Sequence, residues 1–117
     1  MRSINNINRR NLKGLKLGYW EEYYSNNQLN SKGLYVNGLK EGIWEVYWVS
    51  GNLMSRGVYN NGLREGMWEY YWMSGVLMLS GMYINGEEQG LFEFYTRDGL
   101  IDFKRLYRNG IRINFES

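Results

Sequence analysis

A 24-residue repeat constrains the fold of this chain more than any other feature of its sequence. Four copies can be written below one another without a gap, as residues 18–41, 42–65, 66–89 and 90–113. All 15 glycines fall in four columns of this alignment, and all five tryptophans fall in two. A period of this length indicates an array of small units that are stable only when they pack against their neighbours.

Each unit has the composition of a β-hairpin. Residues 44–48 are aromatic and β-branched, which favours a strand, and Ser50-Gly51 follows as a turn. A second strand then runs to Asn61-Gly62, a dipeptide typical of tight hairpin turns. Glycine recurs too often for a helix. The sequence therefore predicts an all-β protein, an elongated single-layer antiparallel β-meander of about four 24-residue hairpin repeats over residues 14–113.

The turn positions also predict how the strands pair. A two-residue turn at Ser50-Gly51 pairs Trp48 with Leu53, Tyr47 with Met54, Glu45 with Arg56 and Trp44 with Gly57. An indole opposite a glycine covers bare backbone, and opposite charges facing each other stabilise a sheet. The tryptophan side should be the better buried face. The residues expected to hold the fold together are Trp20, Trp44, Trp68, Gly33, Gly57, Gly81, Tyr35, Tyr59 and Tyr83.

The two ends of the chain depart from the repeat. Residues 1–13 are polar, and we expect a cap or a disordered segment there, with residues 114–117 as the C-terminal end. In the last unit Arg105 replaces the column glycine opposite Phe92, where a cation–π contact could substitute. Ile111, Ile113 and Phe115 alternate, which favours a closing edge strand.

Composition excludes several kinds of chemistry. The chain has no Cys and no His, so it lacks a thiolate nucleophile, an imidazole base and the usual zinc ligands. Glu21, Glu45, Glu69 and Glu93 form a regular column of carboxylates, but three of them face Lys or Arg, which favours a structural role over catalysis. We assign no catalytic residue, no metal site, no cofactor and no small-molecule substrate.

Charge and hydropathy give no indication of nucleic acid or membrane partners. The net charge is only +2, and the tryptophan columns have few basic neighbours. There is no apolar run of about 18 residues and no hydrophobic leader, so we expect a cytoplasmic protein.

The repeat unit, G-x-W-E-x-Y followed by Y-x-N-G, resembles the MORN repeat (membrane occupation and recognition nexus) over Gly14 to Ile113. It is most similar to the bacterial variant with the unit Y-x-N-G-x-x-x-G-x-W-x-x-Y. This resemblance implies a curved single-layer β-meander that binds other proteins, and it carries over no catalytic residue. Many bacterial variants are antitoxin or immunity components, whereas some eukaryotic members associate with phospholipid membranes.

Columns that differ between units are free for specificity. In the two central units these columns become apolar, while the outer units carry polar or charged residues at most of the same places. Exposed Trp and Tyr are typical binding hot spots, and Met adds adaptability. The alternative is that Trp48 and Trp72 only fill the middle of a thin sheet. The predicted partner-binding residues are Val46, Trp48, Val49, Met54, Tyr70, Trp72, Met73 and Met78.

These features predict a non-catalytic protein-binding module that neutralises a partner protein, as an antitoxin or immunity-type inhibitor would. An alternative is an inhibitor of a host defence nuclease, of the anti-CRISPR type, encoded by a phage or mobile element. A second alternative is a membrane-associated scaffold. The open edges of the sheet also favour self-association into homo-oligomers.

Overall fold

The computed structural model describes residues 7–114 and shows ten strands in that range, with no helix. The strands are β1 (Arg9–Arg10), β2 (Lys16–Tyr23), β3 (Leu29–Val36), β4 (Leu39–Tyr47), β5 (Leu53–Asn60), β6 (Leu63–Tyr71), β7 (Leu77–Ile84), β8 (Glu87–Tyr95), β9 (Ile101–Arg108) and β10 (Ile111–Ile113).

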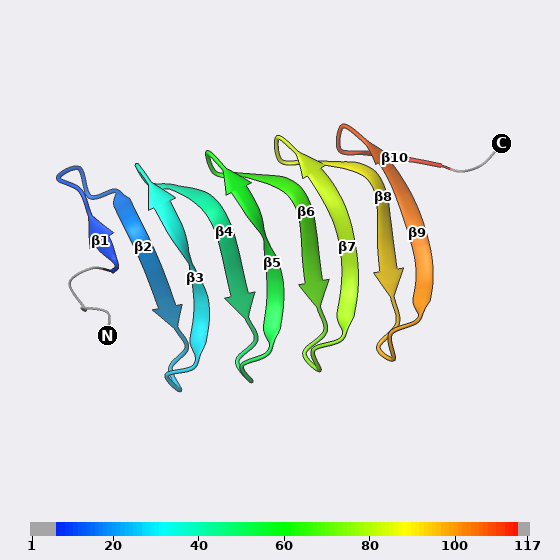
Figure 1. Cartoon of the computed structure of the whole chain (residues 1–117), viewed down its shortest axis with the longest axis horizontal. Helices are drawn as coiled ribbons and strands as arrows, with labels where there is room; N and C mark the ends of the chain where they lie inside the picture. The colour runs from blue at the N-terminus through cyan, green and yellow to red at the C-terminus, as the bar shows by residue number, and fades with distance from the viewer. Residues whose placement is uncertain (1–6, 115–117) are drawn as a thin grey trace.

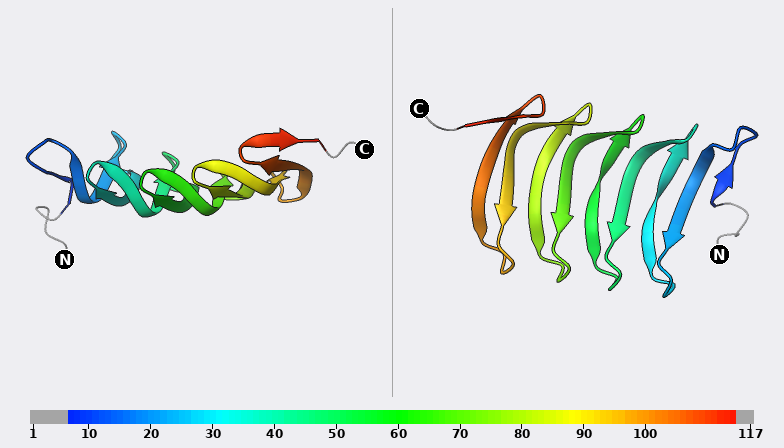
Figure 2. Two further views of the ribbon diagram at one scale, coloured as in Figure 1. Left: turned by 90° about the horizontal axis from the view of Figure 1, so that it is seen from above. Right: turned by 180° about the vertical axis from the view of Figure 1, so that it is seen from behind.

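The ten strands form one open antiparallel sheet in which every strand pairs with its neighbours in chain order. Figure 1 shows them side by side, and Figure 2, seen from above, shows a ribbon one sheet thick along its length. The molecule measures 57 × 30 × 21 Å along its principal axes. The predicted elongated single-layer meander is confirmed, and so is the closing strand, in which Ile111 and Ile113 lie.

The Asn-Gly turns occupy one edge of the sheet. Asn61 and Gly62 have φ values of 50° and 82°, and the other three Asn-Gly pairs in the repeat are nearly identical. Two successive positive φ values define the turn that matches the right-handed twist of a hairpin, and Asn and Gly are the residues that tolerate it. The sequence prediction for these turns is confirmed.

The turns at the opposite edge are longer than predicted. The backbone N–H of Trp48 donates to Asn52 O, and that of Gly51 donates to Trp48 O, each at 2.8 Å. Three residues therefore form the loop, with Gly51 at positive φ. The extra residue shifts the register between Val46 and Tyr47. The predicted pairs Tyr47–Met54 and Trp48–Leu53 are wrong, because Tyr47 pairs with Leu53 instead.

On the Asn-Gly side of this shift, the predicted register between β4 and β5 is confirmed. Glu45 pairs with Arg56, and Trp44 pairs with Gly57. The facing charges also meet, since Arg56 Nε lies 2.9 Å from Glu45 Oε2.

An aromatic ladder forms the core. Successive Trp and Tyr rings from adjacent strands meet edge to face, with centroids 5.0–6.4 Å apart. Lys40 and Arg64 lie over these rings from the Asn-Gly side, about 5 Å from the centroids. The tryptophans are only 3–8% exposed, although no second layer covers them. The ladder consists of Trp20, Tyr35, Trp44, Tyr59, Trp68, Tyr83, Phe92 and Tyr107.

The indoles do cover glycines, but not the ones predicted. A Cβ on Gly33 would lie 2.2 Å from the Trp44 ring, and one on Gly57 would lie 2.1 Å from the Trp68 ring. Each ring therefore lies over the glycine of the strand before its own, while its register partner is the glycine of the strand after. The twist of the sheet explains the difference, because it tilts each side chain toward one neighbour.

The last unit ends the ladder differently from the prediction. Arg105 pairs with Phe92 in register, as expected. Its guanidinium, however, lies over the rings of Phe94 and Phe103, at 5.1 and 5.0 Å. Those two rings are stacked at 4.5 Å and provide a larger π surface than a single ring.

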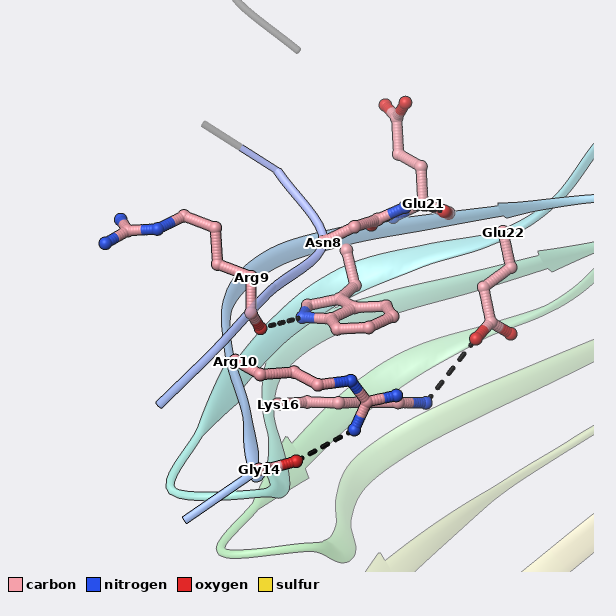
Figure 3. A network of polar contacts seen from close by, with 8 residues as sticks. Asn8, Arg9, Arg10, Gly14, Lys16, Glu21 and Glu22 are labelled. Carbon is pink, nitrogen blue, oxygen red and sulfur yellow. Dashed lines mark hydrogen bonds and ion pairs between the residues drawn. The ribbon is translucent and has the colours of Figure 1, made fainter. Parts of the chain in front are cut away.

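The N-terminal segment extends the sheet by one short strand, β1, which pairs with β2 (Figure 1), and Figure 3 shows polar contacts in this region. Trp20 Nε1 donates to Arg9 O at 3.0 Å, and Asn8 exchanges hydrogen bonds with the backbone of Glu21. Arg10 reaches the Gly14 carbonyl. Within the predicted segment 1–13, residues 8–10 thus contact the first unit. Residues 1–6 and 115–117, including Phe115, lie outside the described residues.

Candidate partner-binding site

An open pocket of about 390 Å³ lies at the edge of the sheet formed by the three-residue turns. Trp48 and Trp72 line it from the ends of β4 and β6, and Met78 lines it from β7. The remaining walls come from the next turns, with Met73, Ser74 and Arg97. Most of its wall is apolar, and its rim carries one cation.

The two pocket tryptophans differ in their hydrogen bonding. Trp48 Nε1 donates to the carbonyl of Tyr71 at 3.1 Å, and in the unit before it Tyr24 reaches the carbonyl of Tyr47 at 2.6 Å. Trp72 occupies the same column one unit later, but its buried Nε1 has no partner among the described residues. The hydrogen bond that the earlier side chains of this column donate to the next unit is therefore absent at Trp72, where the pocket opens.

Arg97 closes the pocket on the C-terminal side. Its guanidinium lies over the Trp72 ring, 5.0 Å from the centroid. Arg97 is exposed, and within residues 7–114 no carboxylate forms an ion pair with its guanidinium. An unpaired guanidinium beside an apolar wall is suited to a ligand that carries a carboxylate next to a bulky apolar group.

The structure brings together only part of the predicted binding set. Four of its members line the pocket, and Val49 is exposed on the preceding turn. Val46 and Met54 are half-buried and do not line it. Ser74 and Arg97 were missed. Arg97 stands in a variable column of the repeat, which is a signal that could have found it.

Tyr70 packs against the ladder and does not line the pocket. Its ring stacks on Trp68 at 6.1 Å, and its hydroxyl lies 3.3 Å from that of Tyr83. Burial, together with this hydrogen bond, raises the pKa of Tyr70 well above its usual value. The hydroxyl therefore stays protonated and contributes to the core.

The glutamate column lies on the other face and is fully engaged. Tyr47 donates to Glu45 at 2.7 Å, and Tyr71 donates to Glu69 at 2.8 Å. Burial works to raise the pKa of Glu45, but hydrogen bonds from Tyr47 and Arg56 and the charge of Lys32 outweigh it and lower the pKa. This carboxylate is ionised at neutral pH and holds its neighbours in place.

Within the described part of the chain, no three acidic side chains come together in a way that could hold a metal ion. The same part contains no helix of the length and apolarity needed to cross a membrane.

The ladder, the two kinds of turn and the edge pocket define a single-layer β-hairpin repeat protein. A protein-family model described as "MORN repeat variant" matches residues 16–37 and 40–61. Repeats of this family are generally protein- or membrane-binding modules and are typically non-catalytic. The later units continue the same columns in the sequence, from Gly66 and from Gly90. No curated protein matches the chain.

Proposed function

We propose that this chain binds one partner protein through the edge pocket and neutralises it by covering a functional surface. The observation that carries the proposal is the pocket itself: it is built where the repeat stops repeating, from Trp72, Met73 and Arg97. Trp and Arg are residue types that dominate binding energy at protein interfaces, and the exposed Met73 adds adaptability.

The chemistry of the pocket favours one kind of partner. Its apolar walls accept a bulky apolar side chain, and Arg97 at the rim attracts a carboxylate. We therefore expect the docked segment to present an aromatic or large aliphatic residue next to Asp, Glu or a chain terminus. Because the combination of Trp72, Met73 and Arg97 does not recur in the other units of the sequence, we expect one partner to be held in one orientation, as an inhibitor of a toxin or nuclease requires.

The test compares capture from an extract of the source cells by the wild-type chain and by three variants. Met73→Glu and Arg97→Glu change the pocket at exposed positions, whereas Met82→Glu introduces the same charge at an exposed position on the opposite face. The proposed partner is retained by wild type and Met82→Glu and lost with both pocket variants. Retention of every captured protein by Met73→Glu and Arg97→Glu contradicts the pocket assignment.

A second step tests neutralisation. The captured partner, purified and assayed for its own activity, should lose that activity at one equivalent of wild-type chain. The partner should keep its activity in the presence of the Arg97→Glu variant. Replacing the docked Asp or Glu of the partner by a basic residue should then restore inhibition by the Arg97→Glu variant. A partner that binds through the pocket and keeps full activity refutes the inhibitor role while leaving the binding role in place.

A further inference from the structure

The face opposite the aromatic ladder carries a band of exposed apolar side chains, with polar and charged residues between some of them, and we call the apolar set the back strip. Ile43 pairs directly with Val58, and Met67 pairs with Met82, so these side chains lie on the same face of the sheet. Each member is 40–70% exposed. The back strip consists of Leu34, Val36, Leu39, Ile43, Val58, Leu63, Met67, Met82, Ile84, Leu91 and Ile111.

Part of the back strip follows the repeat, unlike the edge pocket. Ile43, Met67 and Leu91 occupy one column, and each is about half exposed. The ladder on the other face accounts for the buried columns, but it gives no reason for apolar residues that recur in contact with water. A surface that recurs with the period of the sheet is complementary to another surface with the same period.

The size of the back strip also needs explanation. Its eleven apolar side chains are each 40–70% exposed, and at that exposure they together present roughly 800 Å², the area that a standard interface takes from each partner. The strip is therefore large enough for one complete interface with a partner of similar extent.

The charges within the strip argue against an anionic membrane as its partner. Glu41 and Glu65 lie beside Leu34 and Val58 in the register. Their carboxylates accept hydrogen bonds from the backbone N–H of Asn61 and Asn85, at 2.9 and 3.0 Å, so they are directed toward the turns. Acidic groups repel anionic lipid headgroups, but bound to the turns they leave the apolar centre of the strip free for contact.

We propose that the back strip is the interface of a homodimer, in which two copies of this chain pack back to back about a two-fold axis. The hairpin period is the same on both copies, about 9.6 Å for two strands. Apolar columns of one sheet therefore meet those of the other in step, as they do between the layers of a sandwich. The two edge pockets stay free for the partner proposed above.

Sedimentation equilibrium of the full chain at micromolar concentration tests this proposal. Wild type should show twice the 14.0 kDa mass of the chain, and its unfolding temperature should rise with protein concentration. Met67→Glu places a carboxylate at the centre of the strip, on a side chain that is 56% exposed, so each copy still folds. Its mass should fall by half, with the same circular dichroism spectrum.

Met73→Glu is the matched control, because that side chain is 54% exposed but lies at the edge pocket. This variant should remain a dimer. A wild-type chain that sediments at 14.0 kDa overturns the proposal. So does a Met67→Glu variant that stays dimeric, since association would then run through the open strands β1 or β10. Dissociation by Met73→Glu would place the interface at the pocket and equally overturn the proposal.

Discussion

Two columns of tryptophan run along this sheet, and they differ in what surrounds each ring. Trp44 lies on Gly33, meets Tyr35 and Tyr59 edge to face, and donates to the carbonyl of Leu34 at 3.0 Å. Trp72 lies at a turn beside Arg97, with an unpaired N–H and an open pocket. The first environment recurs from unit to unit, and the second occurs once.

The difference indicates how a repeat protein divides its residues. A ring whose glycine, aromatic neighbours and hydrogen-bond acceptor all recur is held by the fold. A ring whose column changes from Tyr24 through Trp48 and Trp72 to Thr96 lacks those recurring partners and is available at the surface. Substitutions in the two columns should therefore have separable effects, on stability in one and on binding in the other.

The largest expected effect is from Trp68→Ala. This substitution removes the ring that covers Gly57 and contacts Tyr59, Tyr70 and Tyr83, and we expect it to cost about 3–5 kcal/mol of unfolding free energy. Trp72→Ala should cost less than about 2 kcal/mol, because Trp72 lines an open pocket and is only partly buried. Urea unfolding followed by circular dichroism measures both, and equal losses would contradict the division between the columns.

The glycines beneath and beside the rings should respond in different ways. Gly57→Ala places a Cβ 2.1 Å from the Trp68 ring, so the ring must move, at a cost of about 1–3 kcal/mol. A Cβ on Gly66 would meet no atom within 4 Å, but the φ of this residue is 78°. Gly66→Ala should therefore cost about 1 kcal/mol through backbone strain alone.

Gly66→Asn distinguishes the two causes. Asn tolerates positive φ better than Ala, so this variant should be closer to wild type than Gly66→Ala. Gly57→Asn should be at least as destabilised as Gly57→Ala, since the added side chain enters the space of the ring. Thermal unfolding of the four variants is the measurement, and recovery of stability by Asn at position 57 would contradict the steric explanation.

The repeat determined most of the fold from sequence because its signals are local. Asn61-Gly62 requires a particular turn, and a strand pattern between two turns can pair in few registers. The bulge between Val46 and Tyr47 could not be predicted, since it depends on whether the loop closes with two residues or three. The sequence pattern also gave no reason for the column of Gly18, Gly42 and Gly66. The reason is the positive φ of these residues, which only the backbone geometry shows.

The candidate site was predicted less completely, for a physical reason. Internal comparison finds columns that vary, and some of the residues that it selected, such as Trp72 and Met78, line the pocket. It cannot show which varying residues share a wall. Arg97 was missed because its contact with Trp72 crosses from one turn to the next, and Tyr70, predicted as a partner-binding residue, stacks on Trp68 away from the pocket.

A smaller effect should separate the two pocket tryptophans from each other. Trp48→Phe removes the hydrogen bond to the carbonyl of Tyr71 and leaves that acceptor unpaired, whereas Trp72→Phe removes a donor that had no partner. Both lose similar ring area, so Trp48→Phe should be about 1 kcal/mol less stable than Trp72→Phe. Chemical denaturation of the pair tests this, and equal stability would mean that the N–H of Trp72 is satisfied in solution.

The smallest expected effect concerns the tyrosine column on the back face, which also recurs in every unit. Burial and the hydrogen bond to Glu45 raise the pKa of Tyr47 to about 12, and burial with the bond to Glu69 does the same for Tyr71. An unfolded tyrosine titrates near about 10. Because the folded pKa is the higher one, the stabilisation is complete below the unfolded pKa and is lost as pH rises through about 12.

Both side chains are partly exposed, so screening should keep the loss below about 1 kcal/mol each. The unfolding free energy, measured across this alkaline range, should fall more steeply with pH for wild type than for the double variant Tyr47→Phe/Tyr71→Phe. Identical pH dependence of the two proteins would show that the tyrosine column of the back face, although it recurs, does not stabilise the fold as the ladder does.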